Sequence, residues 1–371
     1  MADIWEAILR YRGIGRDESF FHVGGNSLLA VRMQTEVQKK IGLEFSMAEF
    51  YGAPTIEALA ARRRTDYIQM AIGDAETRVV IDKPAAEKAR IPAKAVLLTG
   101  ASGFLGVYLL AELLQKVDRV LCLQRSKNES EGIAAIQKQA EKAGVSVDWS
   151  RIGVVCGDLT APALGLSSEV RRRLARETDA ILHCGAFVHH LHNYQTMKAA
   201  NVESTEELLK LALEEQQKVF CFVSTLSVAS ALTDLNAAPE AVVDNLPGAD
   251  IGYLLTKWTA EKLVAQCSAR YGLPAVIARP GNITGCSSTG FSNFDHNHFW
   301  LFNKGCLQLG AYPDIPSLIE MTPVDVLARA IVALTLAPRE GLAVRNLSNP
   351  RTLNMDDFFG YMGAQGFAVK S

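Results

Sequence analysis

Thr99-Gly100-Ala101-Ser102-Gly103-Phe104-Leu105-Gly106 is the stretch that decides the fold, because its three glycines join an apolar run to a helix-like segment. Glycines keep such a turn tight, and its backbone N–H groups together with the helix N-terminus attract a pyrophosphate. A glycine-rich turn without a ligand is the alternative. The apolar run before it, at 95–99, and the helical pattern after it, at 104–115, favour a dinucleotide site.

Apolar runs continue to alternate with helix-like stretches beyond this turn, which is typical of a parallel sheet with crossover helices. Six runs are expected to form strands, at residues 95–99, 120–123, 152–156, 180–184, 219–223 and 275–278. Helices are expected between them at residues 104–115, 204–213 and 254–271. The sequence therefore predicts an α/β, Rossmann-type, doubly wound parallel sheet.

Residues 1–65 have helical periodicity without strand-like runs, so we expect a small all-α domain of four helices there. The expected helices lie at residues 4–11, 28–41, 47–51 and 56–63. Residues 66–93 show no sustained period and contain Pro84 and Pro92, so we interpret them as a linker. Residues 94–371 then form the second domain.

Composition excludes several classes of protein. The chain has 371 residues, 49% of them hydrophobic, which excludes a disordered chain. With 38 Lys and Arg against 40 Asp and Glu, the formal net charge of -2 gives nucleic acid no general attraction. No signal peptide or long apolar span is present, so no membrane association is expected. Seven widely spaced cysteines indicate reduced thiols, and hence a cytoplasmic protein.

The residues that follow the second run indicate which dinucleotide is bound. An NAD-binding fold places an acidic residue about 20 positions beyond the glycine turn, but this chain has Leu-Gln-Arg-Ser-Lys at 123–127. Arg125 suits the 2′-phosphate of NADP, because a guanidinium binds phosphate through two hydrogen bonds. A solvated basic loop is the alternative reading of this stretch.

Two further stretches follow expected strands at the same edge of the sheet. Asp158, in Gly-Asp-Leu at 157–159, is placed either to bond an adenine amino group or to cap a helix. The fourth run ends in His183-Cys184-Gly185-Ala186, whose small residues suit close approach of a cofactor.

Tyr253 and Lys257 open an expected helix, and their spacing of four puts both on one face. A nearby ammonium stabilises a phenolate, so we expect a lowered pKa for Tyr253 and a role in proton transfer. Ser224, Thr225 and Ser227 supply hydroxyls at the end of the fifth run, where this fold collects its ligands.

Residues 94 to 350 resemble an extended short-chain dehydrogenase/reductase in the order of these motifs and in Arg279-Pro280-Gly281-Asn282. The resemblance implies that Thr225 orients the substrate carbonyl, Tyr253 supplies a proton and Lys257 holds the nicotinamide ribose. Cys184 is a departure, since relatives more often have Asn there. The cofactor-binding residues expected from motifs and resemblance together are Thr99, Gly100, Ser102, Gly103, Phe104, Leu105, Gly106, Arg125, Asp158, Leu159, Gly185, Ala186, Pro280 and Asn282.

The first domain carries Gly24-Gly25-Asn26-Ser27-Leu28 directly before an apolar helix. For an isolated motif, an N-cap serine would be the simpler interpretation. Here the whole segment resembles the phosphopantetheine attachment site of acyl and peptidyl carrier domains. The resemblance implies that Ser27 carries 4′-phosphopantetheine, which a phosphopantetheinyl transferase attaches.

A carrier domain directly before such a reductase resembles the terminal didomain of a nonribosomal peptide synthetase or a related carboxylate-reducing enzyme. That resemblance implies NADPH-dependent reductive release of a Ser27-bound acyl or peptidyl thioester as an aldehyde, with further reduction to an alcohol left open. Upstream modules of the same synthetase are then expected partners. It also implies a smaller C-terminal substrate-binding region, which we expect to be truncated because fuller relatives continue beyond residues 353–367.

Two other functions compete with this one. A redox-inactive release domain would cyclise the tethered chain by a Dieckmann-type condensation, but Tyr253 and Lys257 argue against it. A nucleotide-sugar epimerase would have no use for a carrier domain.

Histidines and aromatic residues gather in two further parts of the sequence. The histidines at 183, 189, 190, 192, 296 and 298 lack a zinc motif, so no metal is expected. The aromatic stretch 291–302 fits a substrate wall, a carrier-docking surface or core packing.

Overall fold

The computed structural model describes the chain apart from residues 44, 46, 78, 83, 86, 190–191, 230–237, 247–250, 295–296, 316–317, 368 and 371. Its N-terminal helices are α1 Ala2–Leu9, α2 Ser27–Ile41, α3 Met47–Gly52 and α4 Ile56–Glu76. They enclose a small core around the fully buried rings of Trp5, Phe20 and Phe50. These rings meet edge to face, with centroids 4.8 Å apart for Trp5 and Phe20 and 5.4 Å for Phe20 and Phe50.

Seven parallel strands form the central sheet of the second domain, in the order β10-β6-β5-β4-β1-β2-β3. They are β1 Ala95–Thr99, β2 Arg119–Gln124, β3 Ile152–Cys156, β4 Ala180–His183, β5 Val219–Val223, β6 Ala275–Pro280 and β10 Leu342–Leu347. The Rossmann-type prediction is confirmed, and each of the six expected runs is a strand. The order reverses between β1 and β4, which is where this fold binds ligands.

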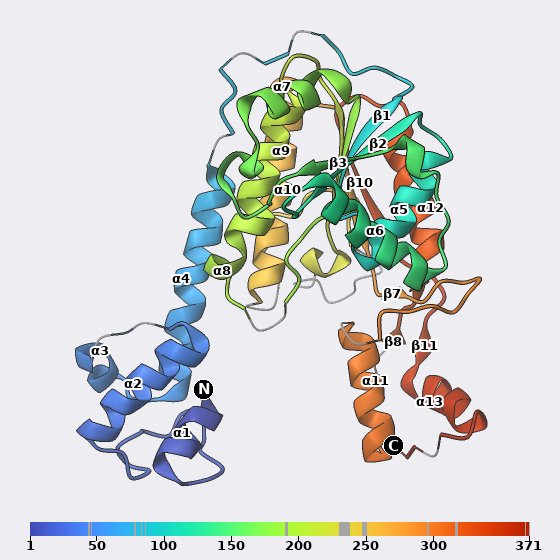
Figure 1. Ribbon diagram of the computed structural model, residues 1–371. Coiled ribbons are helices and arrows are strands. Elements are labelled where there is room, and N and C mark those ends of the chain that lie inside the picture. The colour runs from blue at the N-terminus through green and yellow to red at the C-terminus, as the bar shows by residue number, and fades with distance from the viewer. Residues whose placement is uncertain are drawn as a thin grey trace.

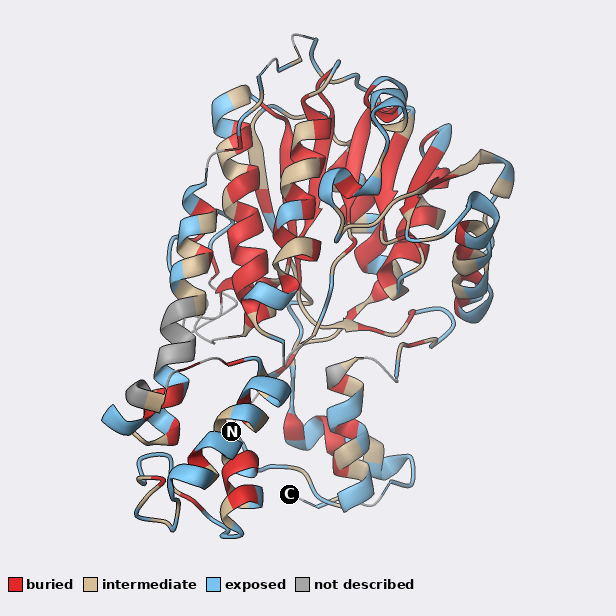
Figure 2. Ribbon diagram, turned by 60° about the vertical axis from the view of Figure 1, so that its left-hand side comes forward, coloured by how far each residue is buried: buried red, intermediate tan, exposed pale blue. Residues whose placement is uncertain are grey.

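Helices cover both faces of the sheet. Helices α5 Phe104–Leu114, α6 Glu129–Ala143 and α12 Val324–Leu336 pack on the face that receives Val96 and Leu98, whereas α7 Ser168–Glu177, α9 Ser204–Ala212 and α10 Gly252–Tyr271 pack on the face that receives Leu97. Successive side chains of a strand point to opposite faces, so β1 contributes to both halves of the core. Figure 2 shows the strands and the inner faces of these helices as one buried layer.

Shorter elements complete the domain. They are α8 Tyr194–Lys198, η1 Trp149–Arg151, η2 Pro162–Gly165, η3 Ala199–Glu203 and η4 Leu226–Ala229.

Helix α4 joins the two domains (Figure 1). The helix expected at 56–63 continues to Glu76, so the first part of the expected linker 66–93 is helical. Its C-terminal half packs against α10, where Ala71 is fully buried. The Asp74 carboxylate accepts a hydrogen bond from the Tyr194 hydroxyl at 2.8 Å and pairs with the Lys198 ammonium at 2.8 Å. The packed face of this extension includes Ile68, Ala71, Ile72 and Ala75, whose spacing is helical, so the linker interpretation overlooked a period that continues past residue 66.

A smaller C-terminal region lies beyond the carboxyl ends of the strands (Figure 1). It contains α11 His298–Leu309, α13 Met355–Ala364 and two short pairings, of β7 Ile283–Thr284 with β9 Thr322–Pro323 and of β8 Leu318–Ile319 with β11 Leu353–Asn354. Phe299, Phe358 and Phe359 form its own apolar cluster. Within the stretch 291–302 some aromatic side chains are buried and others are exposed: Phe299 is buried, whereas Phe294 is 54% exposed.

We expect Asp74→Ala to lower the free energy of unfolding by about 1–3 kcal/mol, because it leaves the Tyr194 hydroxyl and the Lys198 ammonium without their shared acceptor. Urea unfolding followed by fluorescence measures this. Asp82→Ala, at an exposed position of the linker, is the control and should change the midpoint little. Equal effects of the two substitutions would contradict the contact.

Candidate active site and attachment serine

The turn between β1 and α5 has no room for side chains at Gly100 and Gly106. Gly100 has a φ of 79°, and a Cβ on it would lie 2.8 Å from the backbone nitrogen of Gly185. A Cβ on Gly106 would collide with the carbonyl oxygen of Gly100. Gly103 is the N-cap of α5, and no acidic residue lies in the first turn of that helix. A tight glycine turn that leads into a helix N-terminus without an acidic residue is an arrangement that suits a pyrophosphate.

A buried hydrogen-bond chain fixes the ends of β1 and β4 behind this turn. The Thr99 hydroxyl oxygen accepts from the Gly185 N–H at 2.9 Å and lies 2.7 Å from Nδ1 of His183. Thr205 donates its own hydroxyl to the Asn201 carbonyl, so its oxygen accepts from Nε2 of His183 at 3.2 Å. Burial lowers the pKa of His183 to about 3. A neutral imidazole thus links two hydroxyls, and Thr99 and Gly185 act as a framework for the turn.

The adenine end of the expected cofactor site lies beyond β2 and β3. Arg125 is exposed there and stands close to Asp158, whose pKa is lowered chiefly by hydrogen bonds from Thr160 and further by the Arg125 guanidinium. The Asp158 carboxylate accepts from both the N–H and the hydroxyl of Thr160 at 2.8 Å. Its side chain therefore shapes this loop. The Ser102 hydroxyl accepts from Gln124 at 2.9 Å, which ties the glycine turn to the end of β2.

The remaining residues of the expected cofactor set lie around the same edge with different orientations. Leu159 packs against Gly185, where an added Cβ would lie 2.7 Å from its methyl group, and Ala186 is half-buried. Leu105 belongs to the main core, and the Phe104 ring lies 6.1 Å from the Phe291 ring. The side chains of Phe104 and Leu105 therefore point into the protein.

Helix α10 carries Tyr253 and Lys257. Lys257 is buried, and its ammonium donates to the Val223 carbonyl at 2.8 Å and lies 4.5 Å from the Phe222 ring centre. Burial lowers the pKa of Lys257 to about 8. Burial also raises the pKa of Tyr253, and Cys184 adds to this rise. The expected lowering of the Tyr253 pKa is therefore not found, because burial of the phenol raises it and no opposing effect of the Lys257 ammonium accompanies this rise.

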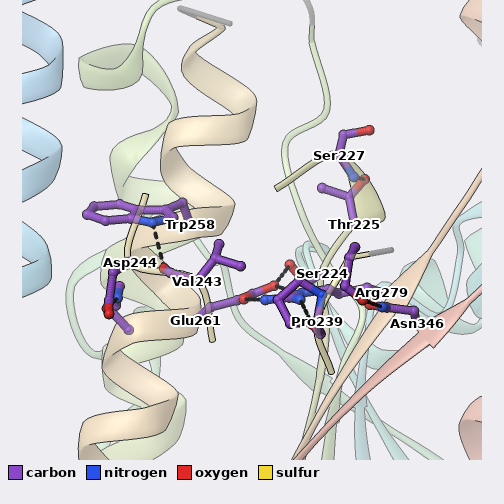
Figure 3. A network of polar contacts seen from close by, with 12 residues as sticks. Ser224, Thr225, Ser227, Pro239, Val243, Asp244, Trp258, Glu261, Arg279 and Asn346 are labelled. Atoms are coloured by element: carbon purple, nitrogen blue, oxygen red, sulfur yellow. Dashed lines mark hydrogen bonds and ion pairs between the residues drawn. The ribbon is translucent and has the colours of Figure 1, made fainter. Parts of the chain in front are cut away.

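Thr225 lies half-buried at the carboxyl end of β5, and its hydroxyl oxygen accepts from the Ser227 N–H at 3.3 Å. The preceding Ser224 is buried and donates to the Glu261 carboxylate at 2.6 Å. Figure 3 shows Ser224 beside that carboxylate, with Thr225 and Ser227 displaced from it. Of these hydroxyls, Ser224 therefore belongs to the structural network.

Pro280 and Asn282 lie at the end of β6, where the resemblance places the nicotinamide. The Asn282 N–H donates to the Glu320 carboxylate at 2.5 Å, and a Cβ on Gly281 would collide with that carboxylate. Glu320 also accepts from the Asn349 N–H at 2.7 Å. It thus joins this loop to the C-terminal region. Sequence reasoning missed Glu320, because its partners lie far away along the chain.

Ser27 is the exposed first residue of α2. The N-cap is Asn26, whose side chain accepts from the Leu29 N–H at 2.9 Å, so the interpretation of Ser27 as the N-cap is wrong. Gly25 leaves no room for a Cβ against Phe20, which fixes the turn before the helix. The local structure thus presents the Ser27 side chain at a helix start without using it as the cap.

The histidines at 190 and 296 lie outside the described residues. Among those that are described, no three His, Cys, Asp or Glu residues are grouped to hold a metal. The rings of His189 and His192 lie 4.1 Å apart beside Phe187. All seven cysteines are described, and each is a free thiol. In the described part of the chain, no helix combines the length and the apolar character needed to cross a membrane.

Comparison with known proteins gives two family matches. Residues 98–331 match the family described as "Male sterility protein", and residues 1–62 match the family described as "Phosphopantetheine attachment site". A linear gramicidin synthase of Brevibacillus parabrevis is 33% identical over 99% of this chain, and L-2-aminoadipate reductase of Saccharomyces cerevisiae is 34% identical over 99%. The chain spans only 8% and 30% of the lengths of these two relatives.

Two solved structures are similar over most of their length. The terminal R domain from the myxalamid PKS-NRPS biosynthetic pathway has a TM-score of 0.74 at 39% identity, covering 81% of this chain and 78% of that one. A thiolation-reductase di-domain from an archaeal non-ribosomal peptide synthetase has a TM-score of 0.65 at 23% identity, covering 99% and 81%. The latter likeness concerns the fold alone.

Gly106→Ala should disrupt the turn, because the added methyl group would meet the Gly100 carbonyl oxygen. We expect at least a tenfold loss of nicotinamide-nucleotide affinity and a lower unfolding temperature, measured by nucleotide fluorescence and calorimetry. Gly360→Ala in α13, where a Cβ would meet open space, is the matched control; it should leave the affinity unchanged and should not lower the unfolding temperature, because Ala is the better helix former. Wild-type affinity in the first variant would exclude this turn as the binding site.

Proposed function

We propose that this chain reduces a thioester held on Ser27 to an aldehyde. The chain belongs to the Male sterility protein family, and it combines that reductase domain with an N-terminal phosphopantetheine carrier domain. The observation that carries the proposal is the joint presence of an exposed serine at the start of α2 and an NAD-type turn with Thr225, Tyr253 and Lys257 in the second domain. A tethered substrate reaches such a site without separate capture from solution.

The glycine turn fits a nicotinamide dinucleotide, because its tightly packed glycines lead directly into the N-terminus of α5, whose first turn carries no acidic residue, and such a helix start favours a pyrophosphate. When bound, NADPH supplies the hydride. Of the expected cofactor residues, Gly100, Gly103 and Gly106 would hold the pyrophosphate, and Pro280 and Asn282 would border the nicotinamide. We propose NADPH over NADH because Arg125 stands exposed beyond β2, where an NAD-binding chain has a carboxylate. Asp158 and Leu159 would border the adenine.

The side chains of this protein would act on the carbonyl oxygen of the thioester. Hydrogen bonds from Thr225 and Tyr253 stabilise the negative charge that develops on this oxygen as hydride reaches the carbonyl carbon. Tyr253 then gives its proton to the oxygen, forming a hemithioacetal. Cleavage of the carbon–sulfur bond releases an aldehyde and returns the pantetheine thiol, so that one thioester, one NADPH and one proton give one aldehyde, one thiol and NADP⁺.

Expected partners follow from the carrier domain. A phosphopantetheinyl transferase would modify Ser27, and upstream modules of the same synthetase would load the acyl or peptidyl group, with the cytosol as the expected compartment. Tyr253 and Lys257 support reduction over a Dieckmann-type release, which needs no hydride.

The direct test loads Ser27 with an acyl-pantetheine from acyl-coenzyme A by means of a phosphopantetheinyl transferase, and then adds NADPH. We expect one NADPH to be oxidised for each aldehyde that is released. If an alcohol forms, two NADPH should be oxidised for each product molecule. Ser27→Ala should take up no acyl group and oxidise no NADPH. Tyr253→Phe should lower the rate at least a hundredfold, because it removes the proton donor. Release of a cyclic product without NADPH oxidation would refute the reductase assignment.

Arg125→Ala tests the cofactor preference. We expect the Kd for NADPH to rise at least tenfold, because the guanidinium contact to the 2′-phosphate is lost, while the Kd for NADH changes less than twofold. Arg172→Ala, which removes an exposed arginine of α7, is the matched control and should change neither Kd. Equal losses of affinity for the two nucleotides in Arg125→Ala would argue against binding of the 2′-phosphate there.

A further inference from the structure

Glu261 lies one turn beyond Lys257 on α10, so Tyr253, Lys257 and Glu261 follow one another at intervals of four on the same face of the helix. The Glu261 side chain is fully buried and pairs with the fully buried guanidinium of Arg279. Nε of Arg279 donates to one carboxylate oxygen at 2.9 Å and Nη2 donates to the other at 2.5 Å. This is a bidentate pair without solvent exposure, directly behind the candidate active site.

The pair joins the ends of two strands that carry expected site residues. The Ser224 hydroxyl donates to the same Glu261 oxygen as Nε of Arg279, at 2.6 Å (Figure 3). Thr225 follows Ser224 directly at the end of β5, and Pro280 follows Arg279 directly at the end of β6. One carboxylate therefore anchors the residue before the expected carbonyl-orienting hydroxyl and the residue before the expected nicotinamide loop.

The Arg279 guanidinium also holds a third segment of the chain. Nη1 of Arg279 donates to the Pro239 carbonyl at 3.1 Å. On either side of this contact, Asn346 of β10 donates to the Ala238 carbonyl at 2.7 Å, and Trp258 of α10 donates to the Val243 carbonyl at 3.2 Å. This segment lies in the sequence between Thr225 and Tyr253. Arg279 thus connects it to the strands and helix that carry the site.

Stability alone does not account for the choice of these residues. A buried ion pair is expensive to desolvate, and well-packed apolar residues in its place are often neutral or stabilising. What an apolar pair cannot do is hold Ser224, Pro239 and two strand ends through directed hydrogen bonds. The geometry of the pair therefore points to positioning.

We propose that Glu261 is a positioning residue for the reduction, which sets Thr225 and the Pro280–Asn282 loop relative to Tyr253 and Lys257 by fixing Ser224 and Arg279. This inference rests on the proposed function. Glu261 acts on Lys257 only through its charge, which partly opposes the lowering of the Lys257 pKa, and its hydrogen bonds go to Ser224 and Arg279. We therefore expect its main effect on the rate of the chemical step, through the placement of Thr225 and the Pro280–Asn282 loop. The pyrophosphate turn belongs to β1 and α5, so nucleotide affinity should depend on Glu261 only weakly.

The test compares Glu261→Gln with wild type as the full acyl-loaded chain, with rates expressed per bound NADPH. We expect the rate to fall at least tenfold, since small displacements of reacting groups cost large factors in rate, while the Kd for NADPH changes less than threefold. The matched control is Glu207→Gln on α9, which removes a carboxylate that pairs with Arg171 of α7 at 2.8 Å. This control should keep the wild-type rate. A wild-type rate per bound NADPH in Glu261→Gln would overturn the inference.

A second variant separates positioning from stability. In Glu261→Leu/Arg279→Met the buried charges are gone, so the unfolding temperature should recover relative to Glu261→Gln. We expect the rate to stay low in this double variant because the directed hydrogen bonds are missing. Recovery of the rate together with the unfolding temperature would show that Glu261 acts only through stability, and would overturn the proposal.

A third readout does not require turnover, so that failure of the proposed function is distinguishable from failure of this inference. Amide hydrogen exchange of residues 224–229 and 279–284 should be faster in Glu261→Gln than in wild type and in Glu207→Gln. Unchanged exchange in both segments would overturn the positioning role. An inactive wild-type protein would instead refute the proposed function and leave this comparison to decide the role of Glu261.

Discussion

Close packing of backbone atoms at the ends of β1 and β4 is the constraint on which the rest of the site depends. Gly100 approaches the backbone of Gly185 so closely that it does not tolerate a Cβ, and Gly106 brings the first turn of α5 against the Gly100 carbonyl. The neutral imidazole of His183 holds this arrangement from behind. A helix start, a strand end and a switch in strand order thereby meet in one place, where backbone donors and the helix dipole favour an anion.

The other half of the candidate site depends on α10, which brings Tyr253, Lys257 and the buried Glu261 carboxylate to the ends of β5 and β6. Lys257 is held by the Val223 carbonyl, and Glu261 is held by Ser224 and Arg279. The two halves thus have different chemistry. Main-chain N–H groups next to α5 suit the charged part of a dinucleotide, whereas directed side chains along α10 suit a reacting carbonyl.

The sequence predicted the fold because its signals are local, and the candidate site residues come from equally local motifs. A strand, a glycine turn and a helix follow one another around Gly100, and a spacing of four places Tyr253 beside Lys257. What could not be predicted depends on contacts between distant residues. Glu261 and Glu320 belong to no local motif, and their pairing with Arg279 and Asn282 joins residues far apart in the sequence. The raised pKa of Tyr253 reflects burial that only the folded chain creates. The half-buried edge strand β10 was missed because it lacks a continuous apolar run.

The central claim is that hydride passes from a nicotinamide nucleotide to a thioester held on Ser27. The most direct measurement loads Ser27 with an acyl-pantetheine, adds NADPH deuterated at the transferable position of the nicotinamide, and analyses the released product by mass spectrometry. The account predicts an aldehyde that carries one deuterium on the former thioester carbon. A released product without deuterium, formed while the labelled nucleotide stays reduced, would contradict it.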